Sequence, residues 1–199
     1  MKIDLHVHTR ERSPCGRSTE DEMIQTAIAL GLDGIALTDH DRLAPPERLA
    51  MLNAKYAPFR VFGGIEVSLG RDHALVLGIQ DRFLEEAEWT YKKLHEFVDI
   101  WGGFLAVAHP FRFYRRMNDG LLDLPPHAME VYSHNTPPRA ESRIRRLAEQ
   151  WEIPLLANSD AHQVAELGAH YNELTRTPAD DAELVEMLRA GEFRPVSRG

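Results

Sequence analysis

Short apolar runs alternate with amphipathic stretches along most of the chain. Apolar runs bounded by turn residues are typical of strands buried in a sheet. They predict strands over residues 2–9, 35–37, 61–67, 72–78, 103–108, 129–132 and 153–157. Apolar residues at spacings of three and four predict helices in the intervening stretches. These helices cover residues 18–30, 45–56, 83–101 and 139–150, with a last helix that begins at Thr177-Pro178 and ends at Gly191.

This alternation predicts parallel βα units in an α/β fold. Polar clusters follow several of the strands, which places a site at the C-terminal edge of the sheet in either a barrel or a doubly wound fold. A full eight-unit barrel usually needs about 200 to 250 residues. At 199 residues the chain favours a smaller, irregular barrel, and it is expected to form one domain over residues 1–199.

The composition is that of an ordinary globular protein, with 43% apolar and 27% charged residues. The net charge of -8 argues against a general affinity for nucleic acid. Cys15 is the only cysteine, which excludes a disulfide framework and a cysteine-based zinc ribbon. The sequence has neither a signal peptide pattern nor an apolar run long enough to span a membrane. A cytoplasmic location without membrane contact is therefore expected.

The first strand carries the pattern Asp4-Leu5-His6-Val7-His8. Alternate side chains of a strand point to the same face, so His6 and His8 project together, roughly 7 Å apart along the backbone. Two neutral imidazoles at this separation can bind one divalent metal. The alternative is a pair of ordinary polar residues on a solvated strand face. A metal site therefore requires further donors elsewhere in the chain.

Further nitrogen and oxygen donors lie at or near the ends of later strands. They are His40, Glu66, His73, His109, Asp160 and His162. Parallel strands would bring these donors together, and such ligands bind zinc, manganese or iron. The acid Glu66 lies inside an apolar run and could bridge two metals. The remaining histidines are expected to lie outside the site, and His95 is expected to be a surface or packing residue; the others are His127, His134 and His170.

These motifs resemble those of the PHP family, the polymerase and histidinol phosphatase domain. The similarity covers residues 1 to about 165, and residues 166–199 would complete the domain. Its motifs, in order, are Asp4-Leu5-His6-Val7-His8-Thr9, Thr38-Asp39-His40-Asp41, Gly64-Ile65-Glu66, Ala108-His109-Pro110 and Asn158-Ser159-Asp160-Ala161-His162. The resemblance implies a distorted seven-stranded TIM-like βα barrel, with two or three metals at its C-terminal face.

The resemblance also implies the ligands of each metal. The first metal would be held by His6, His8, Glu66 and Asp160. Glu66 would bridge to a second metal, whose other ligands are His73 and His109. In family members with three metals, His40 and His162 bind the third together with a histidine in the loop after His8.

This chain departs from that pattern, because its loop over residues 10–16 has no histidine. Cys15 and Glu11 are the only substitute donors in the loop, and Cys15 could equally be a small packing residue. The sequence therefore favours two metals over three. With two metals, His40 and His162 would be free to donate a proton or to contact phosphate.

The expected activity is hydrolysis of a small phosphorylated metabolite or nucleotide by metal-activated water. The expected catalytic residues are His40, His162 and Asp160, with either histidine protonating the leaving oxygen. Arg112 is the predicted phosphate clamp and Arg17 a second candidate, because guanidinium matches phosphate geometry. The alternative for Arg112 is a solvated loop charge. Competing functions are a 3'-5' exonuclease or polymerase-associated activity on nucleic acid, and a metal-binding domain without turnover.

Overall fold

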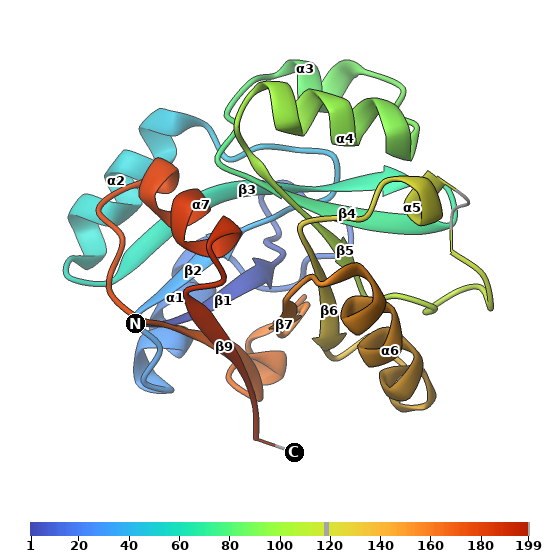
Figure 1. Cartoon of the computed structure of the whole chain (residues 1–199). Helices are drawn as coiled ribbons and strands as arrows, with labels where there is room; N and C mark the ends of the chain where they lie inside the picture. The colour runs from blue at the N-terminus through green and yellow to red at the C-terminus, as the bar shows by residue number, and fades with distance from the viewer. Residues whose placement is uncertain (118–119, 199) are drawn as a thin grey trace.

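One curled sheet of nine strands forms a nearly closed barrel in the computed structural model, which describes residues 1–117 and 120–198 (Figure 1). The strands are β1 (Lys2–Val7), β2 (Gly34–Leu37), β3 (Arg60–Leu69), β4 (Asp72–Leu77), β5 (Phe104–Ala108), β6 (Ala128–Tyr132), β7 (Leu155–Ala157), β8 (His170–Leu174) and β9 (Phe193–Ser197). Their order in the sheet is β7-β6-β5-β4-β3-β2-β1-β8-β9. The curl also brings β7 against β8 and β9. The barrel-like α/β fold is confirmed.

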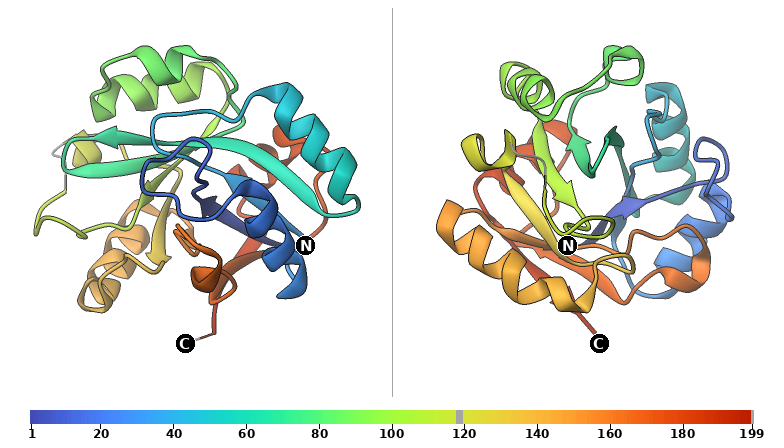
Figure 2. Two further views of the ribbon diagram at one scale, coloured as in Figure 1. Left: turned by 180° about the vertical axis from the view of Figure 1, so that it is seen from behind. Right: turned by 90° about the vertical axis from the view of Figure 1, so that its right-hand side faces the viewer.

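Helices surround this sheet (Figure 2). They are α1 (Glu20–Ala29), α2 (Pro46–Tyr56), α3 (Phe83–Glu86), α4 (Tyr91–Ile100), α5 (Gly120–Asp123), α6 (Glu141–Trp151) and α7 (Asp181–Arg189), with 3-10 turns η1 (Pro138–Ala140) and η2 (Val164–Glu166). Thr19 caps α1, since its hydroxyl accepts from the amide of Glu22. Across the described ranges, no helix combines the length and apolar character needed to cross a bilayer.

The structure corrects the predicted architecture in three places. The sheet has nine strands rather than seven, because β8 and β9 were missed, and β4 runs antiparallel to both neighbours. The helix predicted over residues 83–101 is split into α3 and α4, because Thr90 caps a new helix by accepting from the amide of Lys93. The last helix begins at Asp181 rather than after Thr177, because Asp180 caps it in the same way.

The antiparallel direction of β4 brings its first residues to the edge where β3 and β5 end. His73 pairs with Ser68 of β3 and with Ala108 of β5, which directly precedes His109. A histidine at the start of β4 therefore lies beside residues at the ends of its neighbours. Convergence of the candidate donors does not require all strands to be parallel.

One face of the sheet holds both polar donors and an apolar core. Paired residues of neighbouring strands point to the same face, and Glu66 pairs with Leu75, which pairs with Ala106. Leu75 and Ala106 belong to an apolar cluster that also contains Leu184 and Leu188 of α7. Helix α7 thus packs on the apolar part of this face, while the donors gather at the other end of the strands.

Buried amides close the seam between β7 and β8. The side chain of Asn172 accepts a hydrogen bond from the Ala157 amide (3.1 Å) and donates to the Ala157 carbonyl (2.8 Å) and to Oδ1 of Asn158 (2.8 Å). Asn158 Oδ1 in turn accepts from the amide of Leu5 in β1. Side chains replace strand pairing here, so the segment after β7 is held beside β1.

We predict that Asn172→Ala destabilises the metal-free protein by ~3 kcal/mol, because the Ala157 amide and carbonyl lose their buried partners. Urea unfolding followed by circular dichroism measures the change. The control is Arg194→Ala, which breaks a surface ion pair with Glu173 on the neighbouring strand and should cost under about 1 kcal/mol. Equal stability of the Asn172 variant and the wild type would contradict this account of the seam.

Candidate metal centre

All eight predicted metal donors meet at one edge of the barrel. Their sources are β1 and its end (His6, His8), the turn after β2 (His40), β3 (Glu66), β4 (His73), the end of β5 (His109) and the loop after β7 (Asp160, His162). Groups of these residues have donor atoms that all lie within 4.8 Å of one another. The structure therefore brings together the residues that the sequence singled out.

The most buried group consists of four donor atoms: His6 Nε2, His8 Nε2, Glu66 Oε2 and Asp160 Oδ1. The two nitrogens are 3.0 Å apart. From the two nitrogens to the two oxygens the distances are 3.2 and 3.3 Å for His6, and 3.0 and 3.2 Å for His8. Bonds of about 2.0 Å to a tetrahedral zinc place neighbouring ligands about 3.3 Å apart. The spacing of these atoms fits one small divalent ion.

The chemistry of the same four atoms also fits a cation. Glu66 Oε2 and Asp160 Oδ1 are buried and accept no hydrogen bond from any residue that the structure describes. Two imidazole nitrogens at 3.0 Å repel each other through their lone pairs unless a proton or a cation lies between them. Buried carboxylate oxygens without partners are costly, and a shared cation satisfies all four atoms.

A second group uses the other oxygen of Glu66. Its Oε1 lies 2.9 Å from His73 Nδ1 and 2.8 Å from His109 Nε2. The two oxygens of Glu66 thus face different sets of nitrogens, which is the geometry of a carboxylate that bridges two ions. This arrangement matches the bridging role that the family resemblance implies.

Cys15 belongs to a third group, with His8, His40 and His162. The rings of His40 and His162 both stack against His8, with centroid distances of 4.6 and 4.3 Å, and lie 6.3 Å from each other. His162 Nδ1 lies 2.9 Å from the carbonyl of Asp160, which makes it the protonated nitrogen and leaves Nε2 as the donor. Glu11 is not in the group, because its carboxylate accepts from the Glu20 amide at the start of α1.

Burial and charge set the protonation of these groups. Burial raises the pKa of Glu66, but the charge of His6 and hydrogen bonds from His109 and His73 outweigh burial and hold that pKa well below its ordinary value. Burial lowers the pKa of His8, yet the adjacent carboxylates of Asp160 and Glu66 raise it to about 9. Burial lowers the pKa of His40 to about 4. In the metal-free protein His8 holds a proton that a metal must displace, whereas His40 is neutral at pH 7.

Glu130 is a functional residue that sequence reasoning missed. It is fully buried on β6 and accepts from His6 Nδ1 (2.8 Å), the His109 amide (2.7 Å) and the Asn158 side chain (2.7 Å). A carboxylate on the far nitrogen of a metal-binding histidine orients the ring and increases its basicity. The signal was an acid within the apolar strand at residues 129–132, the same signal that identified Glu66.

The loop residues beside the site hold its backbone in place. The Ser13 hydroxyl lies 3.2 Å from His8 Nδ1 and accepts from the His40 amide at 2.9 Å. Asp39 accepts from the amide and the hydroxyl of Thr9, directly after His8. These hydrogen bonds tie the loop after β1 to the turn after β2, and the metal donors of both segments are positioned together.

The two predicted phosphate-binding arginines lie in different surroundings. Arg112 is 27% exposed, and its Nη1 is 3.6 Å from Asp160 Oδ2, so its guanidinium borders the metal centre. Arg17 donates its backbone amide to the carbonyl of His162, while its side chain is exposed. Arg112 is thus the better placed of the two.

His95 and His127 form a separate group with Asp99. His95 is buried, as a packing residue would be, and its Nε2 lies 3.0 Å from the carbonyl of Pro125. The Nδ1 of His127 accepts from the Leu105 amide, and Arg189 donates to Asp99. Because backbone groups and a guanidinium already bind the donor atoms of this group, we interpret it as a structural hydrogen-bond cluster.

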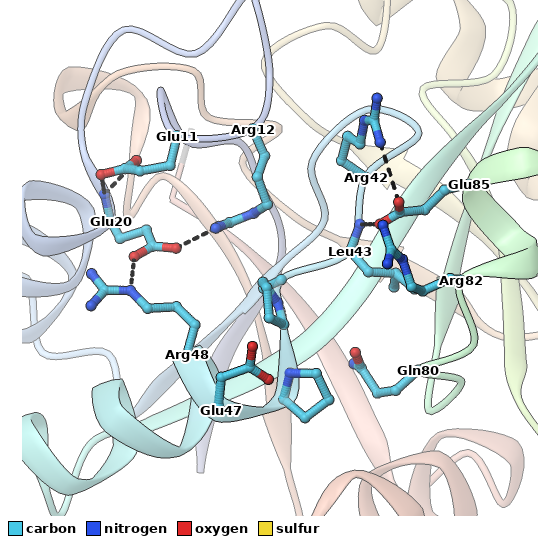
Figure 3. A pocket seen from close by; sticks show the side chains of 13 residues that line it. Glu11, Arg12, Glu20, Arg42, Leu43, Glu47, Arg48, Gln80, Arg82 and Glu85 are labelled. Atoms are coloured by element: carbon cyan, nitrogen blue, oxygen red, sulfur yellow. Dashed lines mark hydrogen bonds and ion pairs between the residues drawn. The ribbon is translucent and has the colours of Figure 1, made fainter.

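A pocket of 730 Å³ lies beside α2, apart from the eight donors, none of which lines it (Figure 3). Its charged side chains are largely paired with one another. Glu20 accepts from Arg12 and Arg48, and Glu85 accepts from Arg42. Arg12 also donates to Asp39, so these pairs support the loop after β1. The pocket holds few free charges for a ligand.

Comparison with known proteins identifies the family. The model of the PHP domain matches residues 4–152 and that of a PHP-associated region matches residues 138–193. The chain therefore belongs to the PHP domain family, a conclusion that agrees with the site.

Among curated proteins, the error-prone DNA polymerase of Nocardia farcinica is 39% identical over 67 residues, which are 34% of this chain and only 6% of the polymerase. Two solved structures share the fold. One is a candidate metal-dependent phosphoesterase from Bifidobacterium adolescentis, with a TM-score of 0.69 at 16% identity, covering 94% of this chain and 95% of the other. The second is a two-domain Bacteroides vulgatus protein containing a predicted PHP-like metal-dependent phosphoesterase, with a TM-score of 0.74 at 16% identity, covering 99% of this chain and 64% of the other.

We predict that Glu130→Gln weakens metal binding about 10- to 100-fold, because His6 loses the carboxylate that orients it. Competition with a coloured chelator measures the affinity, and circular dichroism checks the fold. The matched control, Glu141→Gln, changes a partly exposed acid at the start of α6 and should leave the affinity unchanged. Wild-type affinity in the Glu130 variant would show that this contact does not support the metal.

We also predict that the apparent metal affinity rises with pH between about pH 6 and pH 9. The pKa of His8 in the metal-free protein is about 9, so below that pH a metal must displace its proton. The affinity should therefore increase about tenfold per pH unit for each proton displaced. Titration calorimetry in buffers of different ionisation enthalpy counts the protons released. An affinity that does not change over this pH range would show that protons do not compete with the metal for His8.

Proposed function

We propose that this chain is a metal-dependent phosphoesterase that hydrolyses a small phosphorylated metabolite or nucleotide. The observation that carries the proposal is the shared carboxylate of Glu66, whose two oxygens face separate groups of nitrogen donors. Two ions bridged in this way clamp the attacking and leaving oxygens of a phosphoryl transfer. Membership of the PHP family and the fold shared with phosphoesterase-like proteins support the same reaction class.

Bound divalent ions would supply a water of lowered pKa and neutralise charge on the phosphoryl oxygens. His6, His8, Glu66 and Asp160 would hold the first ion, and Glu66, His73 and His109 the second. Zinc, manganese and iron all suit these donors. The protein's own contribution is to hold the donors rigidly. Glu130 contacts Nδ1 of His6, and the Ser13 hydroxyl contacts Nδ1 of His8.

Arg112 would orient the substrate. Its guanidinium borders Asp160 and is partly exposed, so it can bind two phosphoryl oxygens in a forked geometry. This contact would keep the phosphorus in line with the attacking water. Arg17 remains a second candidate, because its side chain is exposed and its backbone amide donates to the carbonyl of His162.

The grouping of Cys15 with His8, His40 and His162 favours a third ion over the two-ion arrangement that the sequence alone favoured. In that case His40 and His162 serve as ligands. With two ions, one of them would instead protonate the leaving oxygen. The neutral state of His40 at pH 7 suits the ligand role, because a metal does not have to displace the extra proton of a charged imidazolium.

A polymerase-associated activity on nucleic acid is the second candidate, favoured by the short similarity to error-prone DNA polymerase. Processive activity along nucleic acid would need a continuous basic surface, whereas the chain has a net charge of -8. The third candidate, metal binding without turnover, is disfavoured because none of the expected donors of the first two ions is missing.

The deciding experiment combines metal analysis of the purified protein with a panel of phosphomonoesters, phosphodiesters and single-stranded oligonucleotides. We expect bound transition metal and hydrolysis of small esters that a chelator abolishes and the metal restores. Preferential trimming of oligonucleotides would promote the polymerase-associated function. Absence of hydrolysis after reconstitution with zinc, manganese and iron would reject the enzyme.

The third ion has its own test. We expect Cys15→Ser to lower the metal content by one ion per chain relative to the wild type, because the third group loses its thiolate and the other two keep all their donors. Mass spectrometry of the native protein counts the ions. The paired variant Glu11→Gln should retain the full number, since Glu11 faces the start of α1. Loss of an ion from the Glu11 variant alone would show that Glu11, and not Cys15, is the loop ligand of the third ion.

A further inference from the structure

A cavity of 450 Å³ lies beside the metal centre and is lined by basic and aromatic residues. We call it the arginine pocket, and its lining residues are Phe111, Phe113, Tyr114, Arg115, Arg139, Ala140 and Arg143. Three of the seven residues are arginines and none is acidic. Such a concentration of positive charge is unexpected in a chain with a net charge of -8.

Phe113 connects this pocket to the metal centre. Its ring contacts the rings of His73 and His109, with centroid distances of 5.8 and 6.2 Å, and the same residue lines the arginine pocket. Phe113 is 55% exposed, so it is a wall of an open site and not part of the core. The pocket therefore begins one aromatic ring away from the ligands of the second ion.

The positive charge of the pocket is not offset by a carboxylate in the part of the chain that the structure describes. Within residues 1–117 and 120–198, no carboxylate forms an ion pair with Arg115, Arg139 or Arg143. In the pocket beside α2, by contrast, Glu20 pairs with Arg12 and Arg48. Free guanidinium groups at a concave surface favour phosphate, which they bind through forked hydrogen bonds.

The fold also holds one of these guanidinium groups in position. Arg143 stacks on the ring of Phe111 at 4.2 Å and donates to the carbonyl of Arg115 at 2.6 Å. Phe111 has a left-handed backbone with φ of 65°, which is unfavourable for a bulky residue. The chain accepts this conformation directly after His109-Pro110, and it sets Phe111 beneath Arg143. A group positioned in advance loses less entropy on binding.

We propose that the arginine pocket binds a second phosphate group of the substrate, while the first is hydrolysed at the metal centre. The inference rests on the proposed phosphoesterase function and narrows its substrate class to phosphoesters that carry a further phosphate. Either a small bisphosphate or a short nucleotide chain supplies that chemistry. Phosphate at the pocket anchors the substrate through a part that does not react, which increases kcat/KM for these substrates alone.

The test compares matched substrates on the metal-loaded enzyme. Fructose 1,6-bisphosphate is paired with fructose 6-phosphate, and a 5'-phosphorylated trinucleotide with the corresponding mononucleotide; p-nitrophenyl phosphate serves as a substrate with one phosphate. We expect kcat/KM to be at least tenfold higher for one of the two substrates with additional phosphates than for its partner. Which pair shows the difference distinguishes the two sources.

Arg139→Ala should remove most of this difference in kcat/KM and raise KM for the preferred substrate about tenfold. Hydrolysis of p-nitrophenyl phosphate should stay within twofold of wild type. Arg139→Lys, which keeps the charge, should recover part of the difference. The control Arg146→Ala removes the same charge from α6 outside the pocket and should retain the difference. No preference in either pair, or equal losses in the Arg139→Ala and Arg146→Ala variants, would overturn the proposal.

Binding measurements separate this proposal from the proposed function. If the wild type hydrolyses no ester, titration calorimetry with the trinucleotide and the bisphosphate still probes the pocket. Tighter binding of either compound than of its monophosphate partner, weakened about tenfold by Arg139→Ala, would support the pocket while the enzyme is rejected. Binding that does not depend on Arg139 would reject the pocket as well.

Discussion

The structure depends on one buried carboxylate. Glu66 is fully buried and lies within 3.2 Å of ring nitrogens from His6, His8, His40, His73 and His109. A carboxylate in the protein interior is costly unless charges or hydrogen bonds compensate it. Here the compensation comes from five histidines on four neighbouring segments, so assembly of the site and closure of this edge of the barrel require each other.

The path of the chain explains how so many donors reach one carboxylate. The hairpin of β3 and β4 reverses direction, which returns His73 to the level of Glu66 and sets it next to the end of β5. At the seam, Asn158 and Asn172 hold the segment that leads to Asp160 against β1. The remaining length of the strands carries apolar side chains that pack with α7. Polar chemistry and apolar core thus share the same strands.

The sequence predicted the parts of this structure that local patterns encode. Apolar runs ended by histidines or acids located the donors, and apolar residues at helical spacing located α1. Patterns of this kind do not reveal strand direction. The sequence analysis expected His73 to join the other donors through parallel strands, whereas β4 is antiparallel to its neighbours. Strands β8 and β9 lack continuous apolar runs, and β9 contains Pro195; their pairing depends on the closed sheet. Glu130 carried the same local signal as Glu66, an acid within an apolar strand, but its contact with His6 is visible only in the folded structure.

The most direct test of the central role of Glu66 is the metal content of Glu66→Gln, measured by mass spectrometry alongside circular dichroism. The amide keeps the shape of the side chain but removes the charge and one acceptor oxygen. The account predicts that the folded variant loses the ions of both groups that share Glu66, because each uses one of its oxygens. A folded Glu66→Gln protein that retains the wild-type number of ions would contradict it.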